Sequence, residues 1–249
     1  RTEANVEAMQ LLARLVREQR LPRPAESDEL ARYSGWGGLS IERVAASFPP
    51  GIPHPTSQGL IHEYFTPSRV AEAVSGLVLS RLDTLPAHEG GIVRALEPSA
   101  GIGRFLRYLH DPKVAWEAVE LSPLSGLLLG KLYPELDLHL GSFESWAARN
   151  AVALAGTIGL VVANPPYGSR GAERVDDPDR EYSGHRKSIY HYFMRRAMDL
   201  VARGGLGVWL VPMGWMHARS GPTAELRRSM LLRHHVSAAF RLPSRLFPG

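Results

Sequence analysis

From residue 92 onward, short apolar runs alternate with segments of helical periodicity, and this alternation constrains the fold more than any other feature of the sequence. The apolar runs predict strands at residues 92–97, 115–120, 136–140, 158–163, 206–211 and 236–241. The intervening segments predict helices near residues 103–110, 122–132, 143–153, 187–203 and 222–233. Strands that alternate with helices form βαβ units around a parallel sheet. We therefore predict an α/β, doubly wound, Rossmann-like sheet, which binds ligands at the carboxyl ends of its strands.

The residues before this pattern form a separate lead-in. Apolar residues recur there at helical spacing, at Val6, Met9, Leu12, Leu15 and Val16. Pro22 and Pro24 are expected to end that helix, and the glycine-rich and proline-rich stretch 33–58 predicts an irregular segment that drapes over the main domain. Trp36 either anchors this segment to the core or stacks on a base. We predict a lead-in at residues 1–58 and a core at residues 59–249, with a helix after Thr66-Pro67 that Ser68 caps.

Composition limits the class of protein. A hydrophobic fraction of 44% over 249 residues suits a globular α/β domain. No window approaches the roughly 18 consecutive apolar residues that span a bilayer, and the first residues lack a secretory pattern, so we expect a cytoplasmic protein without membrane contact. The absence of cysteine excludes disulfides and thiolate chemistry. A net charge of +4 and a pI near 9.6 suit a polyanionic partner, although a GC-rich genome would also enrich arginine over lysine.

Small residues follow the first predicted strand, in the run Glu97-Pro98-Ser99-Ala100-Gly101-Ile102-Gly103. Gly101 and Gly103 allow the backbone to approach a ligand closely, and the helix beyond them favours a carboxylate or phosphate. A tight strand-to-helix turn without a ligand would use the same residues. The spacing differs from that of a dinucleotide site, because Leu106 stands where the third glycine belongs.

Two further strand ends carry polar residues. The second predicted strand ends in Glu120, at the place where such a sheet binds a ribose diol, with a solvated helix cap as the alternative role for this acid. The third ends at Gly141-Ser142-Phe143, which puts a polar and an aromatic group where an adenine ring would lie.

The fourth predicted strand ends in Asn164-Pro165-Pro166-Tyr167. Two prolines fix the backbone and remove two amide donors, so the Pro165 carbonyl and the Asn164 amide oxygen remain free to accept hydrogen bonds. A tyrosine beside two acceptors suits a planar amine, whereas a rigid turn with the ring packed on the fold is the alternative. The glycine turn, the acidic strand end and this segment follow one another in the order expected of a binding site, which favours a site for a planar amine over a rigid turn.

Taken together, these motifs resemble those of amino-methyltransferases with an Asn-Pro-Pro-Tyr motif, specifically the adenine-N6 DNA methylases of restriction-modification and phage-defence systems. The resemblance covers roughly residues 60 to 247 and implies a class I methyltransferase fold, S-adenosylmethionine as cofactor and double-stranded DNA as substrate. Tyr64-Phe65-Thr66-Pro67 resembles the family's element ahead of the first strand, as in gamma-type enzymes. The lead-in resembles sequences in large proteins that join a methylase to a helicase. We therefore expect truncated C-terminal strands, and sequence recognition in further domains or subunits.

The resemblance also implies roles for individual residues. It implies cofactor contacts by Thr66, Glu97, Pro98, Ala100, Gly101, Gly103, Glu120, Ser142, Phe143 and Asn164. Asn164 and Pro165 would accept hydrogen bonds from the amine of a flipped adenine, with Pro166 part of the same catalytic motif, and Tyr167 would stack on the base. Phe247 resembles the family's second aromatic, which closes the opposite face of the base, and would otherwise fill the core. Ser142 replaces the acid usual before the phenylalanine, which predicts weaker recognition of the cofactor's adenine.

The segment 168–187, which follows Tyr167, is charged. It carries Arg170, Arg174, Arg180, Arg186 and Lys187 among five acids. We expect this segment to be too polar for the core, to be poorly ordered without DNA and to contact backbone phosphates through its arginines, Arg170 and Arg174 among them.

Two other functions fit the same motifs. The segment Asn164–Tyr167, the proposed socket for a planar amine, also fits a glutamine amide of a release factor or a guanine amine of ribosomal RNA. Alternatively, a cofactor site that has lost its function would leave a non-catalytic DNA-binding module. Methylation of plasmid DNA compared with methylation of a release factor distinguishes a DNA methylase from the protein-methylating alternative. The histidines lack the spacing of a zinc site, so we predict no metal.

Overall fold

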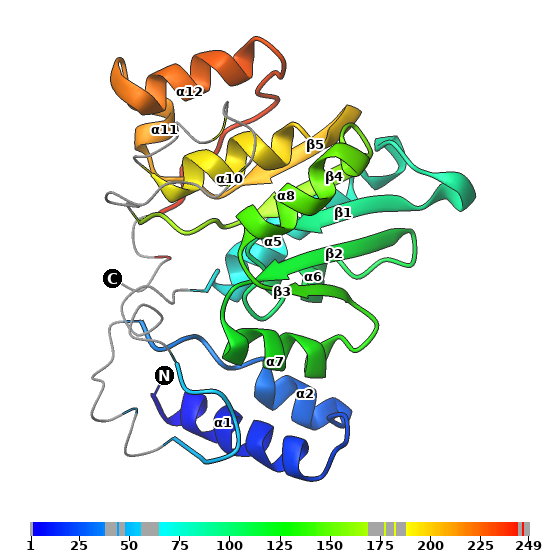
Figure 1. The fold of residues 1–249 in the computed structure, drawn as a ribbon, viewed down its shortest axis with the longest axis vertical. Coiled ribbons are helices and arrows are strands. Elements are labelled where there is room, and N and C mark those ends of the chain that lie inside the picture. Colours follow the sequence, from blue (N-terminus) through cyan, green and yellow to red (C-terminus); the bar gives the residue numbers. More distant parts are fainter. Residues whose placement is uncertain are drawn as a thin grey trace.

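A five-stranded parallel sheet forms the centre of the computed structural model, which describes residues 2–37, 44, 48–55, 65–168, 177, 182, 188–243 and 246. Its strands are β1 (Val93–Glu97), β2 (Val114–Glu120), β3 (Asp137–Leu140), β4 (Ile158–Ala163) and β5 (Val201–Trp209), in the order β3-β2-β1-β4-β5 (Figure 1). The strand order reverses between β1 and β4, and the crevice at such a switch point is where open α/β sheets bind ligands. The predicted doubly wound α/β fold is confirmed.

Helices cover both faces of this sheet. On one face lie α5 (Ser68–Leu79), α6 (Arg104–Tyr108) and α7 (Pro123–Leu132), and on the other lie α8 (Phe143–Leu154) and α10 (Ile189–Met198) (Figure 1). Side chains alternate between the faces: Val161 packs with α8 and α10, whereas Leu160 and Val162 pack with α5 and α6. None of the described helices is long and apolar enough to cross a membrane.

Beyond α10, two more helices complete this face of the molecule. The short α11 (Gly214–His217) and α12 (Gly221–Leu231) pack on α10 through Trp215, Leu226 and Met230. Two 3-10 helices, η1 (Leu82–Thr84) and η2 (Glu89–Gly91), connect α5 to β1.

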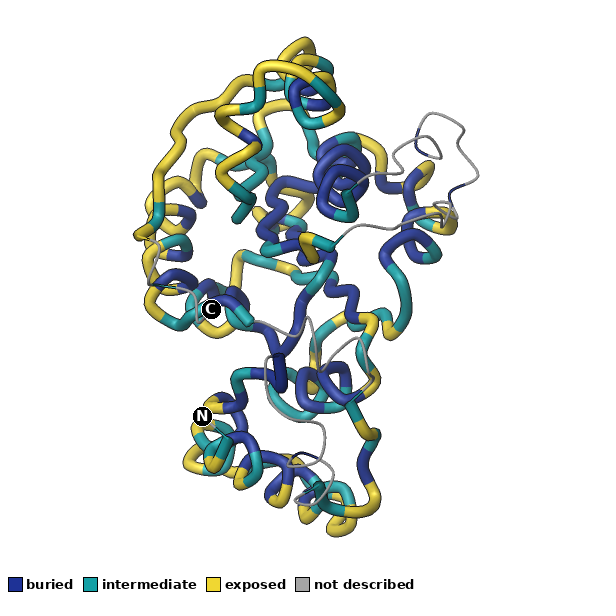
Figure 2. Tube along the Cα trace, turned by 90° about the vertical axis from the view of Figure 1, so that its left-hand side faces the viewer, coloured by how far each residue is buried: buried dark blue, intermediate teal, exposed yellow. Residues whose placement is uncertain are grey.

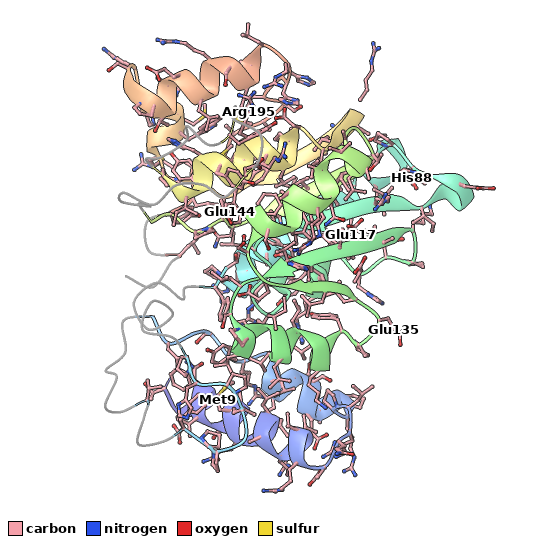
Figure 3. All side chains as sticks on the ribbon, viewed as in Figure 1. Met9, His88, Glu117, Glu135, Glu144 and Arg195 are labelled. Atoms are coloured by element: carbon pink, nitrogen blue, oxygen red, sulfur yellow. The ribbon has the colours of Figure 1, made fainter. Side chains whose placement is uncertain are left out.

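The lead-in folds against α7. Helices α1 (Thr2–Arg17) and α2 (Pro24–Leu30) bury their apolar faces in a cluster that also contains Leu124 and Leu128 of α7. Met9, labelled in Figure 3, lies inside this cluster. Trp36 is only 1% exposed in the same cluster, which confirms its role as an anchor.

The structure corrects five expectations about elements. The predicted strand 236–241 is wrong: these residues have no regular structure and are exposed, because no neighbouring strand in the described part pairs with them (Figure 2). The predicted helix 187–203 ends at Met198, and the fifth strand occupies 201–209 rather than 206–211. Helix α2 was not expected, since Pro24 begins it instead of ending a helix. Ser68 is the first residue of α5, whose cap is Pro67.

Candidate active site

The segment Asn164–Tyr167 leaves the carboxyl end of β4 at the switch point of the sheet. Strand β4 is fully buried, so its backbone holds the start of this segment in a fixed place. Pro165 is buried, whereas Pro166 and Tyr167 are exposed. The change from a buried strand to an exposed aromatic within four residues sets polar groups at the edge of the crevice.

The Asn164 side chain is held from two directions. Its Nδ2 donates to Thr66 Oγ1 at 3.1 Å, and its Oδ1 accepts from the hydroxyl of Tyr167. Thr66 is 5% exposed and precedes α5, so a residue 98 positions earlier in the chain fixes the orientation of the amide. The Ser99 hydroxyl donates to the Asn164 carbonyl at 3.3 Å, which ties the glycine turn to the same residue.

The Tyr167 hydroxyl faces inward although its side chain is 44% exposed. It lies within hydrogen-bonding distance of the Leu210 carbonyl, at 3.1 Å, as well as of Asn164 Oδ1. Burial of this hydroxyl raises the pKa of Tyr167, so it stays protonated and acts as a donor. One hydroxyl has one proton to donate, and the two acceptors therefore compete for it.

The turn Ser99–Gly103 joins β1 to α6 as expected. Gly101 and Gly103 have φ of +58° and +75°, values that glycine adopts readily. A Cβ on Gly101 would lie 2.6 Å from the Phe65 ring, and one on Gly103 would lie 2.7 Å from the Tyr133 ring. Within the described residues, the close approach that requires these glycines thus comes from aromatic side chains of the protein itself.

Two acids stand below this turn, at the ends of β1 and β2. Glu120 accepts from the backbone N–H of Gly101 and from that of Ser122, each at 2.7 Å. Glu97 is 2% exposed, and its Oε2 has no hydrogen-bond partner among the described residues. Burial, with a further contribution from the charge of Glu120, raises the pKa of Glu97 well above its usual range. The Glu97 carboxyl is therefore a buried acid with an acceptor to spare.

Three of the other residues that were expected to contact the cofactor have structural roles. Ser142 caps α8, its hydroxyl accepting from the Ser145 N–H at 3.1 Å. Phe143 is 2% exposed and packs against Phe193, with ring centroids 4.9 Å apart. Ala100 is buried and donates its N–H to the Val119 carbonyl at 2.9 Å. Pro98 is also buried, between Glu97 and the turn.

Part of the expected substrate surface cannot be placed. Arg170, Arg174 and Phe247 lie outside the described residues. The expectation that segment 168–187 is too polar for the core is wrong for two of its residues, because Asp177 and Tyr182 are 7% and 4% exposed. Among the described residues, no three histidine, aspartate or glutamate side chains gather as metal ligands would.

Three contributors to the site were not expected from the sequence. They are the Ser99 hydroxyl, the Leu210 carbonyl and the ring of Tyr190, which meets the Tyr167 ring edge-on at 6.3 Å. Ser99 lies within the recognised glycine turn and could have been found there. The carbonyl and the ring come from distant elements and left no local signal.

Comparison with known proteins shows that the chain is similar to methyltransferases. Residues 136–247 match the family model of the Eco57I restriction-modification methylase. The chain is also 29% identical over 218 residues to the Type II methyltransferase M.TthHB8I of Thermus thermophilus, a match that covers 81% of this chain and 45% of the relative. The chain thus spans less than half the length of this curated relative.

Solved structures share the fold. A Listeria monocytogenes protein assigned to the class I S-adenosylmethionine-dependent methyltransferases is 16% identical, with a TM-score of 0.55 over 100% of this chain and 85% of that one. The methyltransferase subunit of a type I restriction-modification system from Streptococcus thermophilus is 20% identical, with a TM-score of 0.50 over 69% of this chain and 39% of that one. At such identities the likeness establishes the fold alone.

Proposed function

Because the chain is a relative of restriction-modification methyltransferases and has the class I methyltransferase fold, we propose that it transfers a methyl group from S-adenosylmethionine to the N6 amine of a flipped-out adenine in double-stranded DNA. The observation that carries the choice of an amine is the Asn164 side chain, whose amide is locked by Thr66 with its oxygen toward Tyr167. An acceptor held in this way suits an amino group, which has protons to donate.

The residues at the strand ends fit this cofactor. Glu120 ends β2 where ribose hydroxyls are bound in such sheets, and the two N–H groups from which its carboxylate accepts hold it in place there. The unpaired Glu97 oxygen supplies another buried hydrogen-bonding atom. Thr66 links the cofactor site to the site of the target amine, since it contacts Asn164 and the resemblance implies that it contacts the cofactor. When bound, S-adenosylmethionine would supply an electrophilic methyl group: the amine nitrogen bonds to it as the bond to the positively charged sulfur breaks, the neutral thioether leaves, and the methylated amine releases a proton to water.

Asn164 and Pro165 then act on the acceptor amine. The lone pair of an adenine amine is delocalised into the ring and is a poor nucleophile. Hydrogen bonds accepted by the Asn164 oxygen and the Pro165 carbonyl would localise it and stabilise the positive charge that develops. Pro166 keeps this backbone rigid. The chemistry requires no strong general base, and the chain's task is to hold the two groups in line within about 3 to 3.5 Å.

Tyr167 has to change partners when the base arrives. Its hydroxyl donates a hydrogen bond to Asn164 Oδ1 in this structure, and the Leu210 carbonyl lies 3.1 Å away as a second acceptor. If the hydroxyl donates its hydrogen bond to the Leu210 carbonyl instead, Asn164 Oδ1 is free for the target amine and no buried donor is left unsatisfied. The exposed part of the ring is then available to stack on a base, which must leave the duplex to reach this place.

The decisive variant is Asn164→Ala. We expect methyl transfer to fall by roughly two to three orders of magnitude, as for a lost preorganised group, with cofactor affinity nearly unchanged. Incorporation of labelled methyl into plasmid DNA measures the first quantity and calorimetry with S-adenosylmethionine the second. Asn150→Ala on α8, whose side chain donates only to the Trp146 carbonyl, is the matched control and should retain full turnover.

Other results would redirect the proposal. Methyl incorporation into a release factor or ribosomal RNA, with none into DNA, would assign the site to another planar amine. If calorimetry shows no heat of binding at millimolar S-adenosylmethionine, the chain is not a methyltransferase, and a non-catalytic DNA-binding module is the remaining function. The same proposal includes a role in restriction-modification or phage defence, with sequence recognition in further domains or subunits; the match to a restriction-modification methylase family supports the first of these roles.

A further inference from the structure

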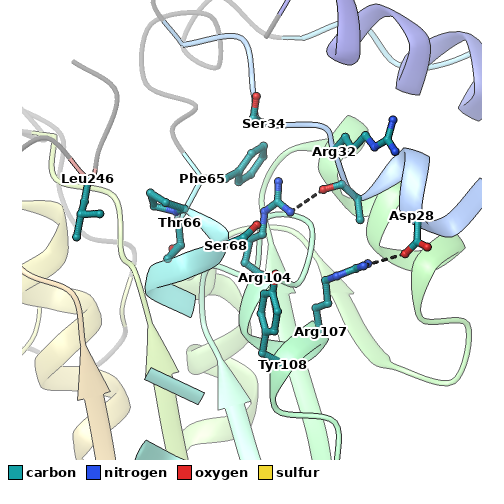
Figure 4. A pocket seen from close by; sticks show the side chains of 12 residues that line it. Asp28, Arg32, Ser34, Phe65, Thr66, Ser68, Arg104, Arg107, Tyr108 and Leu246 are labelled. Atoms are coloured by element: carbon teal, nitrogen blue, oxygen red, sulfur yellow. Dashed lines mark hydrogen bonds and ion pairs between the residues drawn. The ribbon is translucent and has the colours of Figure 1, made fainter. Parts of the chain in front are cut away.

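A cleft of about 550 Å³ lies between the lead-in and the core, beside the candidate active site. Figure 4 shows its walls: α2 and the residues after it on one side, the start of α5 on another, and the outer face of α6 below. Thr66 and Phe65 line it, but Gly101, Glu120 and Asn164 do not. The cleft is therefore a separate space that shares one wall with the cofactor site.

Positive charge dominates this cleft. Its lining has three arginines, Arg32, Arg104 and Arg107, against one acid, Asp28. The Arg104 guanidinium donates to the carbonyls of Ala31 and Tyr33, both at 2.6 Å, and these partners are neutral, so within the described residues its charge is not paired with an acid. The Arg104 Nε is buried without a hydrogen-bond partner among the described residues. Burial and the neighbouring charge of Arg107 lower the pKa of Arg104, but an arginine remains protonated.

The other two arginines are available to a ligand. Arg32 is exposed and has no ion pair within the described part of the chain. Arg107 pairs with Asp28 at 2.8 Å, and since both side chains are substantially exposed, at 36% and 65%, this pair is weak. An incoming anion can compete for Arg107 at little cost.

The start of α5 adds donors to the same space. Pro67 and Ser68 line the cleft, the helix has no side-chain cap, and its first turn contains no acid. Free N–H groups at a helix start favour a negative group in front of them. Arginine guanidinium groups with backbone N–H groups form a combination that matches the oxygens of a phosphate.

The position of the cleft indicates which phosphate it receives. Thr66, in its wall, is 3.1 Å from the amide of Asn164, so the cleft adjoins the proposed binding site of the target base. We propose that this cleft binds a backbone phosphate of DNA beside the flipped-out adenine, through Arg32, Arg107 and the charge of Arg104. The inference rests on the proposed function. Such contacts position the strand without reading its sequence.

Neutralisation of Arg32 tests the proposal in the full chain. Arg32→Gln should raise the Kd for duplex DNA several-fold, equally for any sequence, and lower the slope of log K against log salt by about 0.9, the value for one lost phosphate contact. Arg107→Gln should act in the same direction. The matched control is Arg81→Gln, an exposed arginine beyond the opposite end of α5, which should leave both quantities unchanged. Thermal unfolding of each variant checks that the fold is kept.

Failure of this inference is distinguishable from failure of the proposed function. Wild-type DNA binding and methylation, with Arg32→Gln and Arg107→Gln indistinguishable from Arg81→Gln, would overturn the phosphate site alone. Weaker binding of S-adenosylmethionine by Arg32→Gln, at unchanged DNA affinity, would overturn it in favour of the cofactor's carboxylate. Absence of both DNA binding and methyl transfer to DNA in the wild type would overturn both proposals.

Discussion

Glu97 ends β1 with a carboxyl group that is almost entirely inside the protein. Burial, together with the charge of Glu120, raises its pKa in the folded state. The folded protein therefore holds this proton more tightly than the unfolded chain does. The stabilisation is present at low pH and is lost as the pH rises from the unfolded pKa toward the folded one.

Glu97→Gln should remove this pH dependence. A glutamine keeps the shape of the protonated acid and cannot ionise, so the variant should gain stability relative to wild type as the pH rises above the ordinary glutamate pKa. The gain has a limit of about 1.4 kcal/mol per pH unit for one group. Urea unfolding of both proteins between pH 4 and pH 8 measures the difference. A difference that is constant over this range would contradict a raised pKa.

At the residue scale, local chemistry was readable from the sequence and long-range contacts were not. The burial of Trp36 was one of two roles that its position allowed. The sequence also indicated that Gly101 needs space, but the group that fills it is the Phe65 ring, from 36 residues earlier. Likewise, the acceptor role of Asn164 follows from its motif, whereas the hydrogen bond that orients it depends on how α5 packs beside β4.

At the element scale, the apolar pattern of each strand decided which predictions succeeded. Strands β1, β2 and β4 lie inside the sheet and, like the edge strand β3, were placed within one residue of their observed bounds, because each reads as a short apolar run. Strand β5 is an edge strand in the described sheet and begins with Val201-Ala202-Arg203-Gly204-Gly205, which has no such run. The apolar residues of 236–241 were read as a strand, although a strand also needs a partner.

The polar network between Asp177 and α10 fixes part of the segment that follows Tyr167. The Asp177 carboxylate accepts from the Tyr192 hydroxyl at 2.7 Å and pairs with Arg196 at 3.1 Å. The Arg196 guanidinium also lies over the Tyr182 ring, 4.1 Å from its centroid. Because the Asp177 side chain is fully buried, this pair belongs to the core despite its charge.

Asp177→Ala should therefore destabilise the fold strongly. It leaves Arg196, whose side chain is 11% exposed, without its carboxylate, and removal of one partner from a buried ion pair costs about 3 to 5 kcal/mol. Chemical denaturation measures the loss. Asp83→Ala removes the exposed partner of Lys113 and should have little measurable effect. Equal effects of the two substitutions would show that the Asp177 pair is solvated.

At the scale of the whole molecule, the lead-in and the sheet domain share apolar surface. The expected division at residue 58 separates them in sequence, but Leu12 and Leu15 of α1 pack in one cluster with Ile102 of the glycine turn and Leu128 of α7. Arg104 adds two hydrogen bonds from α6 to the carbonyls that follow α2. Only three-dimensional packing shows this continuity, because the two halves of the cluster lie about a hundred positions apart in the sequence.

This shared core predicts that the chain unfolds as one cooperative unit. Leu12→Ala in α1 and Leu226→Ala in α12 truncate fully buried side chains at opposite ends of the molecule, and each should cost about 2 to 5 kcal/mol. If unfolding is cooperative, each substitution accelerates hydrogen exchange in α1 and in the sheet strands by similar factors, since both regions exchange through the same global opening. Exchange measured residue by residue distinguishes this from independent domains. If the domains unfold independently, Leu12→Ala would accelerate hydrogen exchange in α1 alone and Leu226→Ala would leave exchange in α1 unchanged. The lead-in would then be a separate folding unit that packs on α7.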